Sequence, residues 1–88
     1  MMEKVFVIKN KLGLHARPAA LLVQTASKFK SKVKIIKDGQ EVDGKSIMGL
    51  MTLAACAGSS LKVVADGEDE KEVIDSMGRL VESGFGEE

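Results

Sequence analysis

Apolar residues follow two different spacings along this chain. Alternating or continuous Val, Phe and Ile is typical of strands, whereas apolar residues three or four positions apart are typical of an amphipathic helix. By this criterion the sequence predicts strands at residues 3–8, 32–37, 40–42 and 60–65. It predicts helices at residues 16–28, at about 46–54, and from the acidic run 68–72 up to Gly84.

The resulting order, β-α-β-β-α-β-α, predicts an α+β open-faced sandwich. Each helix has one apolar face, so we expect all three helices to cover one face of a four-stranded, mainly antiparallel sheet. Asp38-Gly39 is a strong hairpin signal between the second and third strands. The alternating Lys32 and Lys34 indicate that the other face is open to water. A ferredoxin-like fold fits the same succession of elements, so the strand order stays open at this point.

Length and composition fit a single domain over residues 1–88, since the chain is 44% apolar and 30% charged. No run is long enough to cross a bilayer and no signal segment is present, so we expect a cytoplasmic protein without membrane insertion. One cysteine excludes an internal disulfide. Cys56 stands among alanines and is expected to be a small buried residue. With one histidine far from that cysteine, the sequence predicts no metal site.

Charge is unevenly distributed, although the formal net charge is zero. Residues 1–37 carry nine Lys or Arg against one acid, whereas residues 38–88 carry twelve acids against four bases. A positive face favours acidic partner proteins. Nucleic acid is the competing partner for such a face. The chain has no Trp or Tyr and only three Phe on which bases can stack, which argues against direct nucleic-acid binding.

The segment Gly13–Pro18 (GLHARP) contains the only histidine and the only proline of the chain. It joins a predicted strand to a predicted helix, so we expect His15 at the N-cap, where the first amides have no intrahelical partner. The amides of Ala16 and Arg17, the helix dipole and the Arg17 guanidinium all favour an anion such as phosphate. These residues suggest a histidine that carries a phosphoryl group. A lone histidine at a helix start is also often a simple polar cap, and chemistry alone leaves both interpretations open.

Together with a second motif, Lys45–Leu50 (KSIMGL), this segment resembles the histidine-containing phosphocarrier (HPr) family of the bacterial phosphoenolpyruvate-dependent sugar phosphotransferase system. The resemblance covers essentially the whole chain and implies the open-faced sandwich. It implies that Nδ1 of His15 accepts a phosphoryl group from phosphorylated enzyme I and passes it to IIA domains of sugar permeases. Arg17 and the amides of Ala16 and Arg17 would stabilise the transferred charge, without a metal or cofactor. The expected protein is a monomeric carrier, not an enzyme.

Ser46 opens the second predicted helix, where the residue type alone indicates an N-cap. The resemblance adds a regulatory role. In HPr proteins of many bacteria, the serine at this place is phosphorylated by a dedicated ATP-dependent kinase. The resemblance therefore implies an HPr kinase/phosphorylase and a catabolite-control transcription regulator as further partners, and a link to carbon catabolite repression.

The same short helix has more large apolar residues than one buried face can hold. Leu50 and Leu53 can point inward, which leaves Ile47, Met48 and Met51 partly exposed. A helix buried on two sides is one interpretation, and an adaptable docking patch is the other. The resemblance favours docking, and it adds first-helix residues to the patch: Ala20, Leu21 and Gln24.

Two related proteins and one structural detail stay open. A purely regulatory relative would keep the serine but lack the histidine, so the presence of His15 argues against it. A paralogue in a nitrogen-related phosphorelay would share the histidine chemistry, and the segment Ser46–Gly49 favours the sugar system. The tail at residues 83–88 is longer than the fold needs and is expected to fray, with Phe85 either free or folded back onto the sheet.

Overall fold

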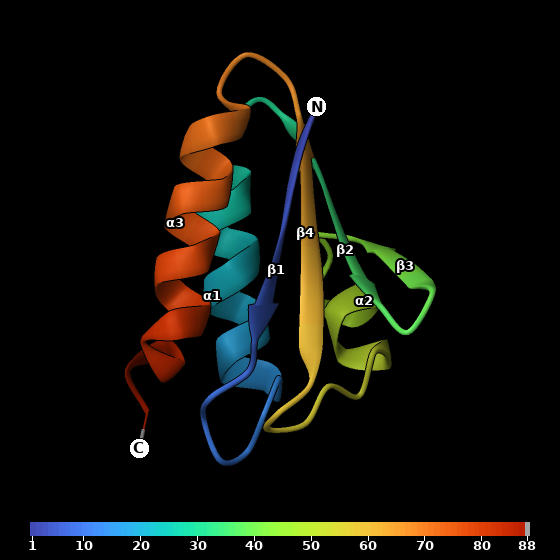
Figure 1. Cartoon of the computed structure of the whole chain (residues 1–88), viewed down its shortest axis with the longest axis vertical. Coiled ribbons are helices and arrows are strands. Elements are labelled where there is room, and N and C mark those ends of the chain that lie inside the picture. The colour runs from blue at the N-terminus through green and yellow to red at the C-terminus, as the bar shows by residue number, and fades with distance from the viewer. Residues whose placement is uncertain (88) are drawn as a thin grey trace.

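The protein is built on one sheet with the strand order β1-β4-β2-β3 (Figure 1). The computed structural model describes residues 1–87. Its strands are β1 (Met2–Val7), β2 (Lys32–Lys37), β3 (Gln40–Asp43) and β4 (Ser60–Asp66). Its helices are α1 (Ala16–Ser27), α2 (Ile47–Thr52) and α3 (Glu70–Glu82), and α3 is followed by a 3-10 turn, η1 (Gly84–Gly86). The predicted order of elements is therefore confirmed.

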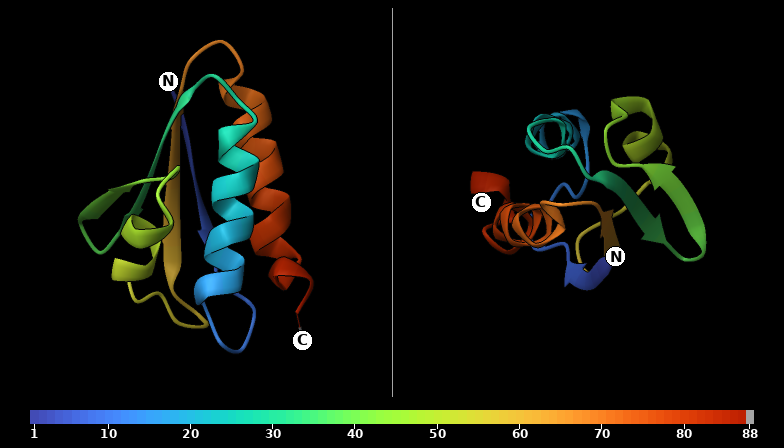
Figure 2. Two further views of the ribbon diagram at one scale, coloured as in Figure 1. Left: turned by 180° about the vertical axis from the view of Figure 1, so that it is seen from behind. Right: turned by 90° about the horizontal axis from the view of Figure 1, so that it is seen from above.

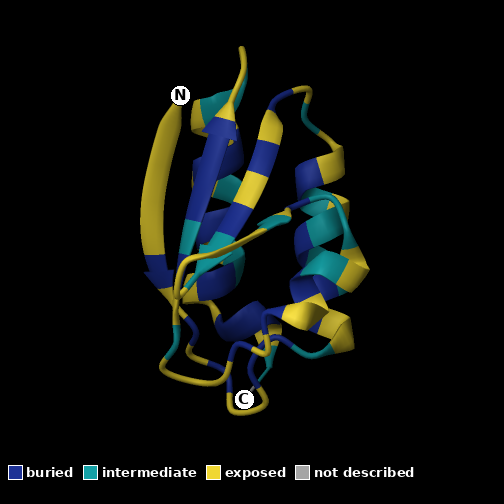
Figure 3. Cartoon of the chain, turned by 90° about the vertical axis from the view of Figure 1, so that its right-hand side faces the viewer, coloured by how far each residue is buried: buried dark blue, intermediate teal, exposed yellow. Residues whose placement is uncertain are grey.

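All three strand pairs are antiparallel, and β4 and β2 are the inner strands. β4 pairs with β1 from Met2↔Ala65 to Val7↔Ser60. On its other side β4 pairs with β2, and β2 pairs in turn with β3. The strand order that the sequence left open is thus the one in which β1 lies at an edge. Figure 3 shows β1 as exposed along most of its length.

The three helices cover one face of this sheet, which confirms the predicted open-faced sandwich (Figure 2). Their apolar faces meet the inward side chains of the inner strands in one core. Residues that are wholly buried in this core include Leu22, Ile35, Leu50, Val63, Val73 and Met77. Lys32 and Lys34 on the opposite face are exposed, as their alternation predicted. Among the described residues, no helix combines the length and apolar character needed to span a membrane.

The connection between α1 and β2 is tied to the start of α3 through one carboxylate. Asp69 accepts hydrogen bonds from the amide of Lys30 at 2.9 Å and from the amide of Ser31 at 3.0 Å. The Ser31 hydroxyl also donates to this carboxylate. These donors, chiefly the hydroxyl, hold the pKa of Asp69 below its ordinary value of 3.8. The ionised carboxylate therefore stabilises the junction of two helices.

Two features differ from what the sequence suggested. Cys56 is exposed, so the prediction that it is buried is wrong. It lies in the turn between α2 and β4, where Ala55 alone of the neighbouring alanines points inward and Ala54 and Ala57 are exposed. The tail also differs, because Phe85 is 4% exposed and belongs to the core. Residues 83–87 follow a defined path with a 3-10 turn instead of extending from the fold, and Glu88 lies outside the described residues.

Candidate functional site

The loop between β1 and α1 holds His15 against the turn that precedes β4. The amide of Leu14 donates to the carbonyl of Ala55 at 2.8 Å, and the Leu14 side chain is buried. Gly13 has a φ of +69°, and a Cβ there would lie 2.4 Å from the Ala55 carbonyl oxygen. Only glycine allows both this backbone conformation and this close approach. The backbone that leads to His15 is therefore fixed against the turn before β4 by the close approach of Gly13 and by the hydrogen bond of Leu14.

His15 is the N-cap of α1, as the sequence predicts. Its backbone is extended (φ −82°, ψ −172°), and its carbonyl accepts the amide of Ala19 at 3.0 Å. Its side chain makes no capping hydrogen bond. Within residues 1–87, the amides of Ala16 and Arg17 have no backbone or side-chain acceptor, and the Arg17 side chain is exposed. Free amides, a helix dipole and a guanidinium thus meet beside an imidazole, and together they can stabilise a phosphoryl group.

The imidazole of His15 contacts a carboxylate from the far end of the chain. Nε2 lies 2.9 Å from Oε2 and 3.1 Å from Oε1 of Glu87. Glu87 is fixed in turn by the Asn10 side chain, whose Nδ2 donates to Glu87 Oε1 at 2.9 Å and to the Gly13 carbonyl at 2.8 Å. The His15 side chain remains 35% exposed, so the ring is held without being covered.

The environment of Glu87 keeps its carboxylate ionised. The hydrogen bond from His15 lowers the pKa of Glu87 most, and the Asn10 amide and the positive charges of His15 and Arg17 lower it further against the opposing effect of desolvation. An ionised carboxylate can only accept hydrogen bonds, so the proton of a neutral His15 ring belongs on Nε2. Nδ1 then carries the lone pair, and it has no hydrogen-bond partner in the part of the chain that the structure describes.

Ser46 lies at the second motif and is the N-cap of α2. Its Oγ accepts the amide of Gly49 at 3.0 Å, which confirms the capping role predicted from sequence. The residue is partly exposed. A hydroxyl at this place is accessible, and it lies beside the amides of a helix start.

The exposed apolar residues of α2 are the ones predicted. Ile47, Met48 and Met51 are 41%, 76% and 44% exposed, whereas Leu50 and Leu53 are buried. α2 packs beside α1, so residues from both helices can contribute to one face. The three α1 residues predicted for this face differ in exposure. Gln24 is exposed and Ala20 is half-buried, while Leu21 is partly buried against the core.

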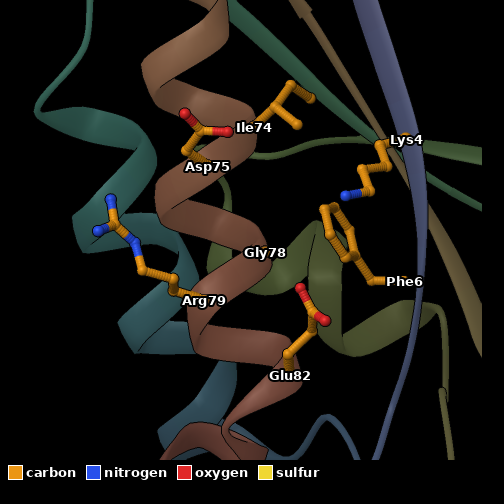
Figure 4. A pocket seen from close by; sticks show the side chains of 7 residues that line it. All are labelled: Lys4, Phe6, Ile74, Asp75, Gly78, Arg79 and Glu82. Atoms are coloured by element: carbon orange, nitrogen blue, oxygen red, sulfur yellow. The ribbon is translucent and has the colours of Figure 1, made fainter.

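A separate concavity of about 340 Å³ lies between β1 and α3 (Figure 4). Lys4 lies above the Phe6 ring there, at 5.4 Å from its centroid, and Gly78 allows the ring to approach the helix. Asp75, Arg79 and Glu82 line the same hollow with mixed charge. It contains none of the predicted site residues, and we assign it no chemistry.

Sequence reasoning missed Asn10 and Glu87, which complete the surroundings of His15. Asn10 lies between the predicted strand 3–8 and His15, where a polar residue is ordinarily exposed, yet it is 2% exposed. Glu87 stands 72 positions after His15, in a tail expected to fray. The only local signal was the Gly-Phe-Gly sequence at 84–86, where an aromatic between two glycines indicates a turn that buries a side chain.

Comparisons with known proteins agree on the family and the fold of this chain. A family model described as "PTS HPr component phosphorylation site" matches residues 2–83. A phosphocarrier protein HPr from Xylella fastidiosa (strain 9a5c) is 48% identical over 88 residues, covering 100% of this chain and 99% of that protein. The crystal structure of HPr-C-His from Thermoanaerobacter tengcongensis matches with a TM-score of 0.96 at 55% identity, covering 100% of this chain and 99% of that one. The crystal structure of Crh from Bacillus subtilis, described as a catabolite repression protein and a domain-swapped dimer, matches with a TM-score of 0.76 at 44% identity. The match covers 94% of this chain and 95% of that one.

Proposed function

Because this chain belongs to the HPr family of phosphocarrier proteins of the phosphotransferase system, we propose that His15 accepts a phosphoryl group from phosphorylated enzyme I and passes it to IIA domains of sugar permeases. The observation that carries the proposal is His15 at the N-cap of α1, with Nε2 bound by a carboxylate and Nδ1 unbound within the described residues. The protein acts as a carrier and not as an enzyme, since it is itself the acceptor and then the donor.

In the proposed step, the Nδ1 lone pair attacks the phosphorus carried by enzyme I. The bond between phosphorus and the donor atom of enzyme I breaks, and its electron pair returns to that atom. Arg17 and the amides of Ala16 and Arg17 stabilise the phosphoryl oxygens on His15. A half-exposed ring suits transfer in both directions, because the same open face must admit the donor and then the acceptor.

The docking face proposed for these partners consists of exposed or partly exposed apolar and polar residues of α1 and α2. Methionine suits such a surface because its flexible side chain adapts to more than one partner. Its members are Ala20, Leu21, Gln24, Ile47, Met48 and Met51. We propose that the chain acts as a single domain in the cytoplasm and as a monomer. The domain-swapped dimer described for Crh makes the oligomeric state a property to measure.

A regulatory role for Ser46 is the second part of the proposal. Its hydroxyl already occupies a helix N-cap, so a phosphate there would meet free amides and need not unfold α2. The added negative charge would stand beside Ile47 and Met48 and weaken docking of acidic partners. The similarity to Crh, a catabolite repression protein, favours an HPr kinase/phosphorylase and a catabolite-control transcription regulator as partners. Mass spectrometry of cells grown on a preferred sugar tests this role, and an unmodified Ser46 under those conditions would contradict it.

The carrier role is tested by transfer of label from phosphoenolpyruvate through enzyme I to the wild type and to His15→Ala. We expect an acid-labile, alkali-stable label on the wild type only, because phosphohistidine has that stability. Ser46→Ala is the matched control and should be labelled like the wild type. Label that persists in His15→Ala would place the acceptor elsewhere, and an unlabelled wild type would refute the carrier role.

A further inference from the structure

Glu87 meets His15 through a conformation of the tail that the core holds in place. Three consecutive residues after α3, Gly84, Phe85 and Gly86, have φ values of +67°, +57° and +72°. Positive φ is uncommon for a bulky residue such as phenylalanine, and it persists only where the surroundings enforce it. Here the ring is buried, so burial of Phe85 compensates for the unfavourable backbone. After this turn the chain lies at the same end of the molecule as the loop before α1 (Figure 1), and there Glu87 contacts His15.

Asn10, in the loop after β1, donates the hydrogen bonds that hold Glu87 from the other side. Asn10 is 2% exposed, and it uses both hydrogens of its amide, one on the Gly13 carbonyl and one on Glu87. Its Oδ1 is buried without a hydrogen-bond partner among the described residues. A buried amide oxygen without a donor is costly. The Asn10 side chain therefore gives up one hydrogen bond while it holds both the loop of His15 and the carboxylate of Glu87.

From this cluster we infer that Glu87 is a positioning residue, which holds the proton of His15 on Nε2 and so presents Nδ1 as the nucleophile. The inference rests on the proposed carrier function and deepens it. Glu87 lies beyond residues 2–83, which the family model matches. A carboxylate that orients a histidine through one ring nitrogen fixes the tautomer and the ring direction at the other.

The same contact serves both halves of the transfer. When Nδ1 attacks phosphorus, the bond between phosphorus and the donor atom breaks and the Nε2 proton stays where it is, so no proton has to move on His15. The phosphorylated ring then carries positive charge, which the Glu87 carboxylate stabilises. When the group leaves for the next acceptor, the N–P electron pair returns to Nδ1 and the leaving group is a neutral imidazole. Without the Nε2 proton, the leaving group would be an imidazolate anion, which leaves far less readily.

The first test is nitrogen NMR of the unphosphorylated full chain, which needs no partner protein. At a pH at which the spectrum shows a neutral ring, we expect wild-type His15 as a single Nε2–H tautomer. In Glu87→Ala, we expect the ring nitrogens to move toward averaged shifts, because the carboxylate no longer holds the proton on Nε2. Glu82→Ala is the matched control, since it removes an exposed glutamate five positions earlier and should leave the shifts unchanged. Identical ring shifts in wild type and Glu87→Ala would overturn the inference.

The second test is the rate of phosphoryl transfer from phosphorylated enzyme I to the same three proteins. We expect Glu87→Ala to react about three- to tenfold more slowly, the effect of losing one charge-assisted hydrogen bond at a partly exposed site. Glu87→Asp should recover part of the loss, because it restores a carboxylate. A wild type that accepts no label would refute the carrier function. The NMR comparison of wild type and Glu87→Ala would still test whether Glu87 positions His15. A normal transfer rate in Glu87→Ala would leave the carrier function intact and overturn the inference.

Discussion

Replacing Gly13 with alanine is expected to destabilise the protein at the loop that carries His15. The backbone at Gly13 has a φ of +69°, which costs an L-residue roughly 1–2 kcal/mol. Alanine also restricts the unfolded chain, which offsets about 0.4–1 kcal/mol of that cost. The new Cβ would in addition lie 2.4 Å from the Ala55 carbonyl oxygen and 2.9 Å from Cα of Cys56. Both are backbone atoms, so the loop itself must shift.

That shift strains the hydrogen bond from the Leu14 amide to Ala55, which is 2.8 Å long. Overpacking of this kind costs about 1–3 kcal/mol. We therefore expect Gly13→Ala to lower the free energy of unfolding by about 2–4 kcal/mol, measured by urea denaturation followed by circular dichroism. Transfer to His15 should slow as well, because the ring moves with the loop.

Gly39→Ala is the matched control. Gly39 has a φ of +81°, but a Cβ there would meet nothing within 4 Å. This variant carries the conformational cost without the clash, so we expect a loss of about 1 kcal/mol. Equal losses in the free energy of unfolding of the two variants would show that the turn before β4 accommodates the new Cβ at no cost. The contact of Gly13 with that turn would then not fix His15.

Three further predictions concern other elements. In Asp69→Asn, stability should fall at neutral pH. The difference in stability from the wild type should shrink as the pH falls through 3.8 and then through the lowered native pKa of Asp69. The reason is that the ionised carboxylate, held chiefly by the hydrogen bond from Ser31, is the form that stabilises the fold. A pH-independent difference in urea titrations would contradict this linkage. Ser46→Ala should cost about 1 kcal/mol through loss of the N-cap, whereas Ser46→Asp, an equally good cap, should stay near wild type in the same assay. Gly78→Ala would bring a Cβ within 2.5 Å of the Phe6 ring, so we expect a net loss of about 1 kcal/mol in thermal or urea unfolding despite the better helix propensity of alanine, and a gain would disprove the close contact.

Sequence reasoning succeeded where the information is local. α1 ends one residue before its predicted end, and β2 has its predicted bounds, because apolar spacing and capping residues act within a few positions. The Ser46 cap and the inward Leu50 follow from the same kind of local pattern. The order of strands does not, since pairing depends on packing between segments far apart in the chain. It could be anticipated only through resemblance to a family.

The exposure of Cys56 and the contact of Glu87 could not be predicted from sequence for a common physical reason. Cys56 was judged by its alanine neighbours, but in a turn adjacent residues point in different directions, and only Ala55 is buried. Glu87 was judged by its place in a polar tail, but its role depends on Asn10, 77 positions away. A contact between residues so far apart in the chain cannot be predicted from the sequence of either segment alone. The resemblance predicted His15 and Arg17 as site residues, and both their place in a site and their chemical roles stay predictions.

The position of β1 at the sheet edge has a consequence for how the protein is made. β1 is synthesised before β4, the strand with which it pairs in the described part of the chain, and β2, β3 and α2 are made between them. The early chain can form helix α1 and the β2–β3 hairpin, since these need only local contacts. It cannot close the sheet or bury Phe6 until β4 and α3 have left the ribosome. The nascent chain therefore exposes an unpaired β1 until β4 has been made, and His15 gains its Glu87 partner only after α3 has been made.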